Sequence, residues 1–288
     1  MPSETLSAPP PPGAAMPPSR AVGPTPRAEL PYDELQVMGL RLLDIPRHEL
    51  ADHVAQAARR QARMLVVNAN AHCMVLAQRA PWLRDLFDRA DIAFCDGAGV
   101  QLAALFLIGR RPHRTTPPEW IGPVLQDLGA DARIFWLGGE QSVAEEGARA
   151  FEVRYGVQTA GIRNGFFDAI PGSTDSEDII RQITAARPNL LLVNMGMPRQ
   201  ERWLYDNWDR LPPTVAITAG ALVDHAAGRV RRPPRWVANM GVEWLVRLCR
   251  EPKRLWRRYL IGLPIFGYHV LRWRFHLGRR STSCPTES

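Results

Sequence analysis

The stretch RADIAFCDGAGVQL, residues 89–102, has the pattern of a strand, a glycine turn and a helix. An apolar run typical of a buried strand ends at Asp96, two glycines come next, and a second apolar run is typical of a helix. Asp96 has two interpretations at this turn. It is either an acid that caps the turn, or a catalytic carboxylate in a crevice that acts as a general base.

Runs of the same kind recur along the chain. Each is short and apolar, and most are followed by a helical pattern such as the one over residues 71–89. The candidate strands are RMLVVNAN (63–70), ADIAFCDG (90–97), ARIFWLGG (132–139), VQTAGI (157–162), NLLLVNMG (189–196) and TVAITAGA (214–221). Strands of this type separated by helices predict an α/β fold with a mostly parallel sheet and helices on both faces.

Polar residues and glycines stand where the candidate strands end. The carboxyl ends of parallel strands meet at one edge of a sheet, and ligands of such sheets bind beyond that edge. The residues expected there are Asn68, Asn70, Asp96, Gly138, Gly139, Asn194, Gly196 and Gly220. We therefore predict a ligand crevice at this edge.

Charge and cysteine content narrow the class of protein. The 288 residues carry a net charge of +7, and the pI is near 9.8. This balance favours an anionic partner, and a membrane face or a phosphorylated substrate fits better than nucleic acid because no recognition signature for nucleic acid is found. Cys73, Cys95, Cys249 and Cys284 lack the spacing of a disulfide framework or a zinc site, which favours a reducing cytoplasm.

The chain divides into three predicted regions. Residues 1–32 are rich in proline and small residues and are expected to be a disordered tail. Residues 33–228 contain the strand–helix pattern. Residues 229–288 form a basic appendage whose amphipathic helix pattern, over residues 241–262, is typical of a helix on an anionic membrane surface. The most apolar run, residues 259–271, is too short to span a bilayer and contains glycines and a proline.

The stretch NMGMPRQERWL, residues 194–204, predicts a binding loop. A strand ends at Asn194, and Pro198 is expected to start the next helix at its first turn. Exposed N–H groups at such a helix start favour an anion or a sugar oxygen. Gln200 and Glu201 would face the crevice from this turn, although a helix cap with solvated charges is the simpler alternative.

Two other ligand classes are weakly indicated. Gly97-x-Gly99 could open a dinucleotide site, but Leu102 stands where that pattern requires a third glycine. The histidines are scattered and no DxD pair occurs in a sugar-nucleotide context. We therefore expect no metal or other cofactor, with arginines stabilising a leaving diphosphate instead.

Seven blocks of this sequence resemble one known family in order and spacing. They are NANAHCMVLAQ, ADIAFCDGAGV, FWLGG, NGFF, LLLVNMGMPRQERWL, GALVDHAAGRVRRPPRW and GVEWLVRLCREPKRLWRRY, which span roughly residues 35–262. The family is that of the WecG/TagA/CpsF glycosyltransferases. The resemblance implies a Rossmann-like sheet and an inverting transfer of a sugar from a UDP donor to a polyprenyl-diphosphate-linked saccharide. It also implies a peripheral enzyme at the cytoplasmic face of the bacterial inner membrane, with a homo-oligomer as one possible state.

The resemblance assigns roles to particular residues. Asp96 takes the place of the aspartate in the family's DG motif, which is proposed as catalytic base, and Gln200 that of the glutamine in its PxQE motif. Arg247, Arg254 and Arg257 resemble diphosphate clamps of the appendage. The remaining candidate substrate-binding residues are Asn68, Asn70, Arg114, Gly138, Gly196 and Glu201.

Two departures from the family pattern bear on the donor sugar. Members that use N-acetylmannosamine tend to have threonine where this chain has Asn68, and an Arg…Gly-x-Asp pattern where it keeps Arg114 but has Pro117 and Glu119. A changed polar set in a sugar pocket alters specificity strongly. We therefore expect a hexose such as glucose, as in the exopolysaccharide branch of xanthan-type assembly. Transfer of N-acetylmannosamine, a non-catalytic membrane scaffold and a dehydrogenase remain the alternatives.

Overall fold

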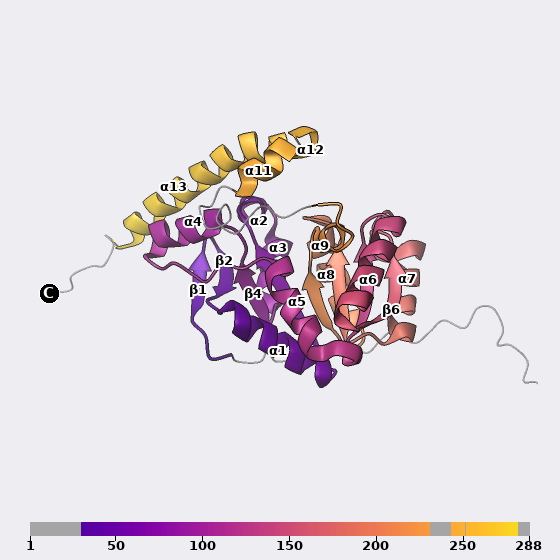
Figure 1. The fold of residues 1–288 in the computed structure, drawn as a ribbon. Coiled ribbons are helices and arrows are strands. Elements are labelled where there is room, and N and C mark those ends of the chain that lie inside the picture. The colour runs from indigo at the N-terminus through magenta and orange to yellow at the C-terminus, as the bar shows by residue number, and fades with distance from the viewer. Residues whose placement is uncertain (1–29, 231–242, 251, 282–288) are drawn as a thin grey trace, which may run out of the picture.

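A six-stranded, all-parallel sheet forms the centre of the computed structural model, which describes residues 30–230, 243–250 and 252–281 (Figure 1). The strand order is β4-β3-β8-β7-β5-β6. The strands are β3 (Met64–Ala69), β4 (Ile92–Cys95), β5 (Arg133–Gly138), β6 (Gln158–Arg163), β7 (Leu190–Asn194) and β8 (Val215–Thr218). The predicted strands are thus confirmed, and their carboxyl ends lie at one edge.

Helices cover both faces of the sheet, which confirms the predicted α/β class (Figure 1). One face is covered by α1 (Arg47–Arg59), α5 (Pro117–Leu128), α6 (Gln141–Tyr155) and α9 (Leu222–Ala226). The other is covered by α2 (Ala71–Ala77), α3 (Pro81–Arg89), α4 (Ala98–Ile108), α7 (Thr174–Ala186) and α8 (Arg199–Asn207). Short 3-10 turns follow α5 and α8, at Gly129–Asp131 and Trp208–Arg210. Strands β3, β4, β5, β7 and β8 bury side chains on both faces, whereas β6 at the edge of the sheet is only partly buried.

One predicted helix is two helices. The expected helix over residues 71–89 is interrupted between Ala77 and Pro81. Pro81 has no backbone N–H to donate to the preceding turn, and it disfavours the α conformation at Ala80, which is the N-cap of α3.

A β-hairpin is formed near the start of the described residues. β1 (Glu34–Val37) pairs antiparallel with β2 (Leu40–Leu43), and its buried side chains join the core. The guanidinium of Arg41 donates to the carbonyl oxygens of Phe87, at 3.3 Å, and Ala90. These bonds attach the hairpin to the end of α3, next to β4.

The packed structure includes the last residues of the expected 1–32 tail. Leu30 and Tyr32 lie against the core beneath α1, and the Tyr32 hydroxyl is 2.9 Å from Nε2 of His53. The tail prediction is therefore too long by these residues, because an aromatic ring and a leucine bury enough apolar surface to pack. Residues 1–29 lie outside the described residues.

The appendage is helical where it is described. It comprises α11 (Glu243–Arg250), α12 (Pro252–Trp256), a π-helical turn at Arg257–Ile261 and α13 (Gly262–Ser281). The helix α13 continues directly from the π-helical turn and runs through Pro264 and Gly267. Among the described helices, none is long and apolar enough to cross a membrane.

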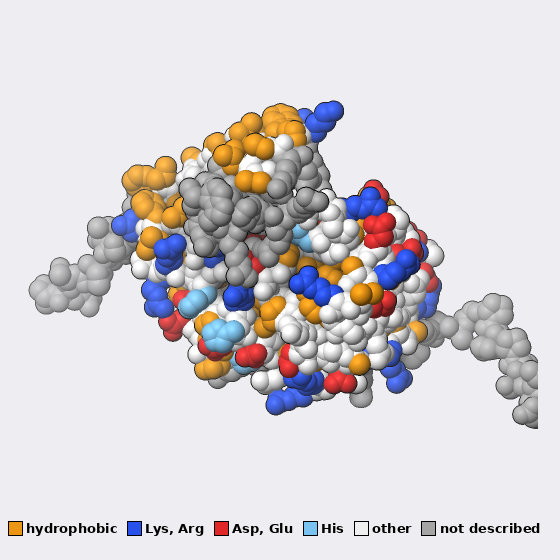
Figure 2. Space-filling model, in the orientation of Figure 1, with side chains coloured by type: hydrophobic (Ala, Val, Ile, Leu, Met, Phe, Trp, Pro, Cys, Tyr) orange, Lys and Arg blue, Asp and Glu red, His pale blue; other side chains and the backbone are white. Residues whose placement is uncertain are grey.

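The helix α13 is held on the core by one of its faces. Phe266 is buried in the core cluster, and the indole Nε1 of Trp273 donates to Oε1 of Gln78 at 2.8 Å. His269 is also buried there, and burial, with Arg272 and Arg79 nearby, lowers the pKa of its imidazole. The opposite face of α13 is apolar and exposed, and it continues onto α4 (Figure 2).

Close approach of two strand ends predicts a stability difference between two glycines. An added Cβ at Gly138, with φ +125°, would lie 2.4 Å from the carbonyl carbon of Asn194, whereas Gly156, with φ +69°, has open space. Replacing Gly156 with alanine is expected to lower the free energy of unfolding by about 1–2 kcal/mol, the cost of a left-handed residue. Gly138→Ala should cost about 2 kcal/mol more, because backbone must also move. Urea unfolding of both variants measures the difference, and equal losses would contradict the close approach.

Candidate active site

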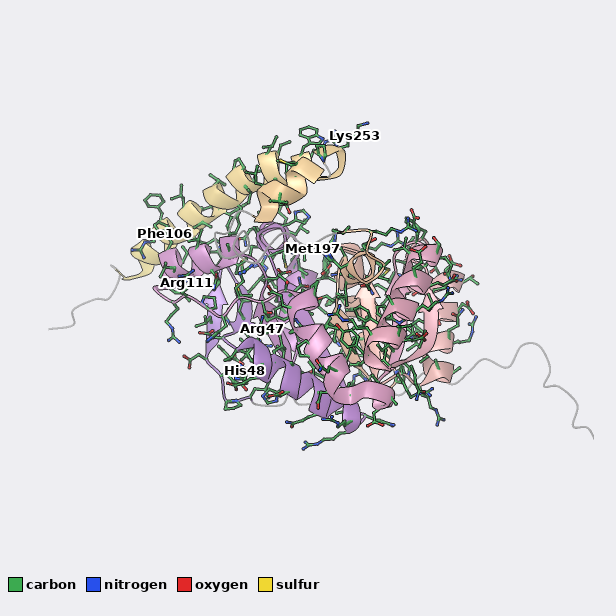
Figure 3. All side chains as sticks on the ribbon, in the orientation of Figure 1. Arg47, His48, Phe106, Arg111, Met197 and Lys253 are labelled. Carbon is green, nitrogen blue, oxygen red and sulfur yellow. The ribbon has the colours of Figure 1, made fainter. Side chains whose placement is uncertain are left out.

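The polar residues and glycines predicted for the crevice do lie at the carboxyl edge of the sheet, on the side that faces the appendage (Figures 1 and 3). The appendage touches this edge directly. An added Cβ at Gly99, in the first turn of α4, would lie 3.7 Å from the ring of Phe266 in α13. The turn that carries Asp96 is therefore next to the docked helix.

Asp96 comes directly after β4, and its side chain turns toward the neighbouring strand. Its backbone N–H donates to the carbonyl oxygen of Ala69 at 2.8 Å. The N-cap of α4 is Gly97, so Asp96 does not occupy the capping position. Instead its Oδ2 accepts a hydrogen bond of 2.6 Å from Nδ2 of Asn68 in β3. The carboxylate is therefore positioned from the sheet rather than used to start the helix.

Asn68 is itself held by the next strand. Its Oδ1 accepts from the Thr218 hydroxyl at 2.7 Å, and that hydroxyl accepts from the Asn68 backbone N–H at 3.1 Å. Asn68 and Thr218 are both buried. Sequence analysis missed Thr218, although a polar residue at the end of the strand in TVAITAGA is the same signal that selected Asn68.

The backbone next to Asp96 pairs with the segment that carries Arg114. Arg114 pairs with Cys95 through a parallel backbone bridge, and the N–H of Thr115 donates to the Cys95 carbonyl at 3.1 Å. Burial raises the pKa of the Cys95 thiol, and the charge of Asp96 raises it further. Cys95 is therefore a protonated thiol, which excludes it as the nucleophile.

Gln200 braces two loops of the edge. Its Oε1 accepts from the backbone N–H groups of Gly196 and Gly220, each at 3.2 Å. Its Nε2 donates to Oε1 of Glu201 at 2.7 Å. Gln200 is 2 % exposed and Glu201 0 %, so these side chains lie inside the edge instead of facing an open crevice as expected. The reason is that the two glycine loops need an acceptor that the backbone does not supply.

The start of α8 differs slightly from the prediction. Pro198 occupies the N-cap position, after a cis Met197–Pro198 bond, and the helix begins at Arg199. The guanidinium of Arg199 donates to the Phe167 carbonyl and lies 5.2 Å from the centre of the Phe167 ring. It therefore ties α8 to the segment that follows β6.

Three other predicted residues have roles in helix starts. Asn70 is the N-cap of α2, and its side chain accepts from the N–H of Cys73 at 3.1 Å. Glu119 completes a capping box at the start of α5, where its carboxylate accepts from the Thr116 N–H at 2.9 Å. Pro117 is the first residue of that helix, where proline is favoured.

Of the three appendage arginines, one is described in full. Arg257 is exposed, and its guanidinium lies 5.3 Å from the Trp256 ring. Arg247 and Arg254 belong to α11 and α12, but their side chains lie outside the described residues.

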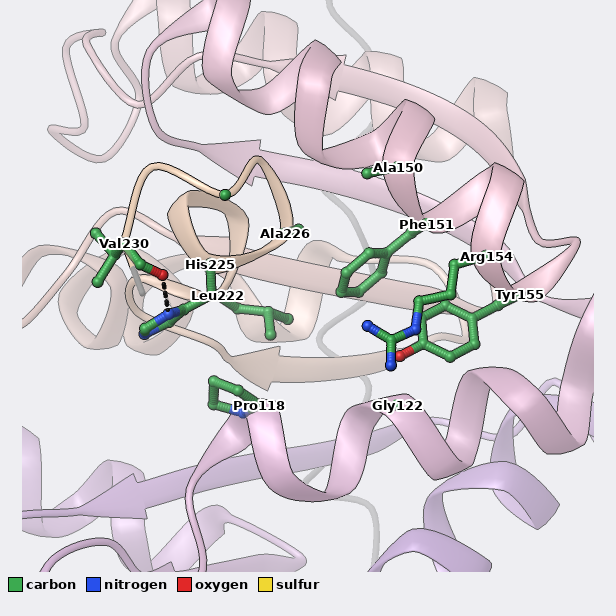
Figure 4. A pocket seen from close by; sticks show the side chains of 11 residues that line it. Pro118, Gly122, Ala150, Phe151, Arg154, Tyr155, Leu222, His225, Ala226 and Val230 are labelled. Atoms are coloured by element: carbon green, nitrogen blue, oxygen red, sulfur yellow. Dashed lines mark hydrogen bonds between the residues drawn. The ribbon is translucent and has the colours of Figure 1, made fainter. Parts of the chain in front are cut away.

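A cavity of about 550 Å³ opens between α5, α6 and α9 (Figure 4). Its walls include Phe151, Tyr155 and Leu222, with the guanidinium of Arg154 at one end. At the other end, Nδ1 of His225 lies 2.8 Å from the Val230 carbonyl oxygen. The predicted site residues are not among the described residues that line it, so it is separate from the Asp96 cluster.

Within the described part of the chain, no group of three or more His, Cys, Asp or Glu side chains is placed to hold a metal ion. A cation beside the Asp96 turn is Arg114, whose backbone pairs with that of Cys95. Independence from metal stays a prediction.

Comparison with known proteins identifies the family. The model of the glycosyl transferase WecG/TagA/CpsF family matches residues 35–280. An N-acetylglucosaminyldiphosphoundecaprenol N-acetyl-beta-D-mannosaminyltransferase of Staphylococcus aureus strain MW2 is 26 % identical over 210 residues, which are 73 % of this chain and 80 % of the relative. The protein of the same name from strain MRSA252 is 25 % identical over 210 residues.

A parallel sheet with a carboxylate held at its carboxyl edge is the arrangement of an α/β enzyme that binds its ligand beyond the strands. Because the family match covers most of its length, the chain belongs to the WecG/TagA/CpsF family and is a glycosyltransferase. The family predicted from the sequence is confirmed.

The brace at Gln200 predicts a stability effect. Gln200→Leu removes the acceptor of two backbone N–H groups and is expected to lower the free energy of unfolding by about 1–3 kcal/mol. Gln141→Leu is the matched control, because Gln141 is exposed and its side chain donates to that of Glu145, which is also exposed and lies on the same helix. That control should stay within about 0.5 kcal/mol of the wild type. Chemical unfolding compares the two, and an equal effect would contradict the bracing role.

Proposed function

We propose that this enzyme transfers N-acetylmannosamine from a UDP-linked donor to an N-acetylglucosamine carried on a polyprenyl diphosphate. The observation that carries the proposal is Asp96, held by Asn68 at the carboxyl edge of a fold whose family transfers sugars. The acceptor and the sugar follow the names of the staphylococcal relatives.

In the proposed reaction Asp96 acts as the general base. Its carboxylate takes the proton of the acceptor hydroxyl while that oxygen attacks the anomeric carbon of the donor from the face opposite UDP. The bond between the anomeric carbon and the UDP oxygen breaks, so the configuration inverts and UDP leaves with the electron pair. Arginine cations such as Arg114 and Arg257 would stabilise the leaving diphosphate without a metal ion.

The preference for glucose loses its support. The relatives are named for N-acetylmannosamine, which favours the alternative that sequence analysis left open. The structure also supplies internal roles for the departures on which glucose rested. Glu119 is engaged in the capping box of α5, Pro117 starts that helix, and Asn68 is engaged by Asp96 and Thr218. These residues therefore carry no independent argument for a hexose.

A donor panel tests the proposal. Purified protein receives UDP-N-acetylmannosamine, UDP-glucose or UDP-N-acetylglucosamine with a polyprenyl-diphosphate-N-acetylglucosamine acceptor and EDTA. Transfer from UDP-N-acetylmannosamine is expected to survive EDTA. It should fall about 100–10,000-fold in Asp96→Asn, the range for loss of a general base.

Asp85→Asn, an exposed acid on α3, is the matched control and should keep wild-type activity. Transfer only from UDP-glucose would restore the hexose alternative, and an active Asp96→Asn variant would remove the base. Loss of all transfer in EDTA, restored by Mg²⁺ or Mn²⁺, would overturn metal independence.

We further propose that the enzyme docks on an anionic membrane surface through α13 and α4 together. Leu102 on α4 is 64 % exposed and Phe275 on α13 is 71 % exposed. The guanidinium of Arg274 lies 5.7 Å from the Phe106 ring, which joins the two helices (Figure 3). The surface consists of Leu102, Leu105, Phe106, Ile265, Tyr268, Leu271 and Phe275, with Lys253, Arg257, Arg272 and Arg274 exposed around it.

The composition of this surface supports a lipid partner. An apolar face bordered by cations suits the interface between headgroups and acyl chains, where burial of side chains adds to attraction for anionic lipids. Its position beside the Asp96 turn would bring the base to a lipid-linked acceptor. Membrane docking would thus place the enzyme peripherally at the cytoplasmic face.

Vesicle flotation tests the membrane proposal. Leu102→Glu on α4 and Leu271→Glu on α13 should each weaken binding to phosphatidylglycerol-containing vesicles about tenfold or more, because burial of a leucine contributes about 1.5–3 kcal/mol. Val153→Glu is the control, since Val153 on α6 is 85 % exposed away from this surface. If Leu102→Glu floats like the control, α4 is not part of the docking surface.

A further inference from the structure

We infer that Asn68 and Thr218 are positioning residues for the catalytic base, rather than contacts to the donor sugar. The inference rests on the proposed role of Asp96. It assigns a role to Thr218, which sequence analysis missed, and it replaces the sugar-binding role expected for Asn68. Three hydrogen bonds among Thr218, Asn68 and Asp96 carry it.

The hydrogen bonds of this cluster run in one consistent direction. The Thr218 hydroxyl oxygen accepts from the backbone N–H of Asn68, and its own proton is donated to Oδ1 of Asn68. With Oδ1 accepting, the amide Nδ2 is the atom that faces Asp96, and it donates to Oδ2 at 2.6 Å. An amide donor fits an ionised carboxylate oxygen, which only accepts.

The three side chains come from three adjacent strands. Asp96 follows β4, Asn68 lies in β3 and Thr218 ends β8, and these strands are neighbours in the order β4-β3-β8. Asn68 is 7 % exposed and Thr218 0 % exposed. This buried chain of hydrogen bonds, from Thr218 through Asn68 to Asp96, is called the relay below. It restricts the rotamer of the carboxylate, which is how supporting residues hold a reacting group in productive geometry.

The relay has a consequence for the proton transfer. When Asp96 takes the acceptor proton, a proton on Oδ2 would be directed at the amide N–H of Asn68. A proton on Oδ1 leaves Oδ2 as an acceptor, and the hydrogen bond from Asn68 persists. Proton transfer to Oδ1 is therefore the transfer that keeps the hydrogen bond from Asn68 intact.

Steady-state kinetics separates positioning from sugar binding. Asn68→Leu should lower kcat about 10–100-fold, the range for loss of a supporting residue. The KM for the UDP-sugar should change less than about threefold, because positioning acts on the chemical step. Thr218→Val should lower kcat about 3–10-fold, and Thr218→Ser, which keeps the hydroxyl, should restore it to within about twofold.

A rise in the donor KM with unchanged kcat in Asn68→Leu would assign Asn68 to the sugar and overturn the inference. An unaltered kcat in Thr218→Val would overturn the role of Thr218. Thermal unfolding of each variant checks that the fold is retained. Thr218→Ser serves as the folded reference if Thr218→Val is destabilised.

A second measurement does not depend on turnover. Proton–nitrogen NMR of the wild type follows the Asn68 side-chain amide as pH falls. Its resonances should move with the protonation of Asp96, and this transition should be absent in Asp96→Asn. Other charged or titratable groups near this turn are Cys95 and the residues whose charges act on its thiol, Arg114 and Asp44. They remain in the Asp96→Asn variant, so a transition caused by them would persist there.

The two measurements distinguish the possible failures. If the wild type transfers no sugar but the amide transition is seen, the proposed function fails and the Asn68–Asp96 pairing stands. If transfer occurs and the amide transition persists in Asp96→Asn, the pairing fails while the proposed function stands.

Discussion

The parallel pairing of β3 with β4 on one side and β8 on the other is the constraint on which the site depends. It places three strand ends in one row, so that Asp96, Asn68 and Thr218 meet although they are far apart in the chain. Parallel strands buried on both faces are rigid, and a carboxylate attached to them is held more precisely than one on a loop. The position of the proposed base is therefore set by the sheet.

Several polar residues near these strand ends, which could have been expected to bind ligand, instead form hydrogen bonds to backbone groups of the protein. Gln200 satisfies two glycine N–H groups, Asn70 caps α2 and Glu119 caps α5. Glycine loops leave N–H groups without helical partners, and a buried polar group must be satisfied. A residue at the crevice edge can thus be essential to the site without touching substrate.

The appendage extends this arrangement toward the proposed membrane surface. The docked face of α13 is built from Phe266, His269 and Trp273, and Phe266 packs beside Gly99 of the Asp96 turn. The apolar outer face continues onto α4, which belongs to the core. One helix of the sheet layer and one of the appendage therefore share a surface, which would couple lipid docking to the position of the base.

The α/β class, the six strands and the edge at which the polar residues gather could be predicted from the sequence, because apolar runs and glycine turns are local signals. The family could be predicted as well. The sequence pattern predicted one helix where Pro81 separates two. It did not predict the β1–β2 hairpin, whose stability comes from packing. The contact of Asn68 with Asp96, and that of Thr218 with Asn68 across 150 residues of chain, could not be predicted in this way. Hydrogen bonds between distant strands depend on strand order, and no local pattern encodes that order.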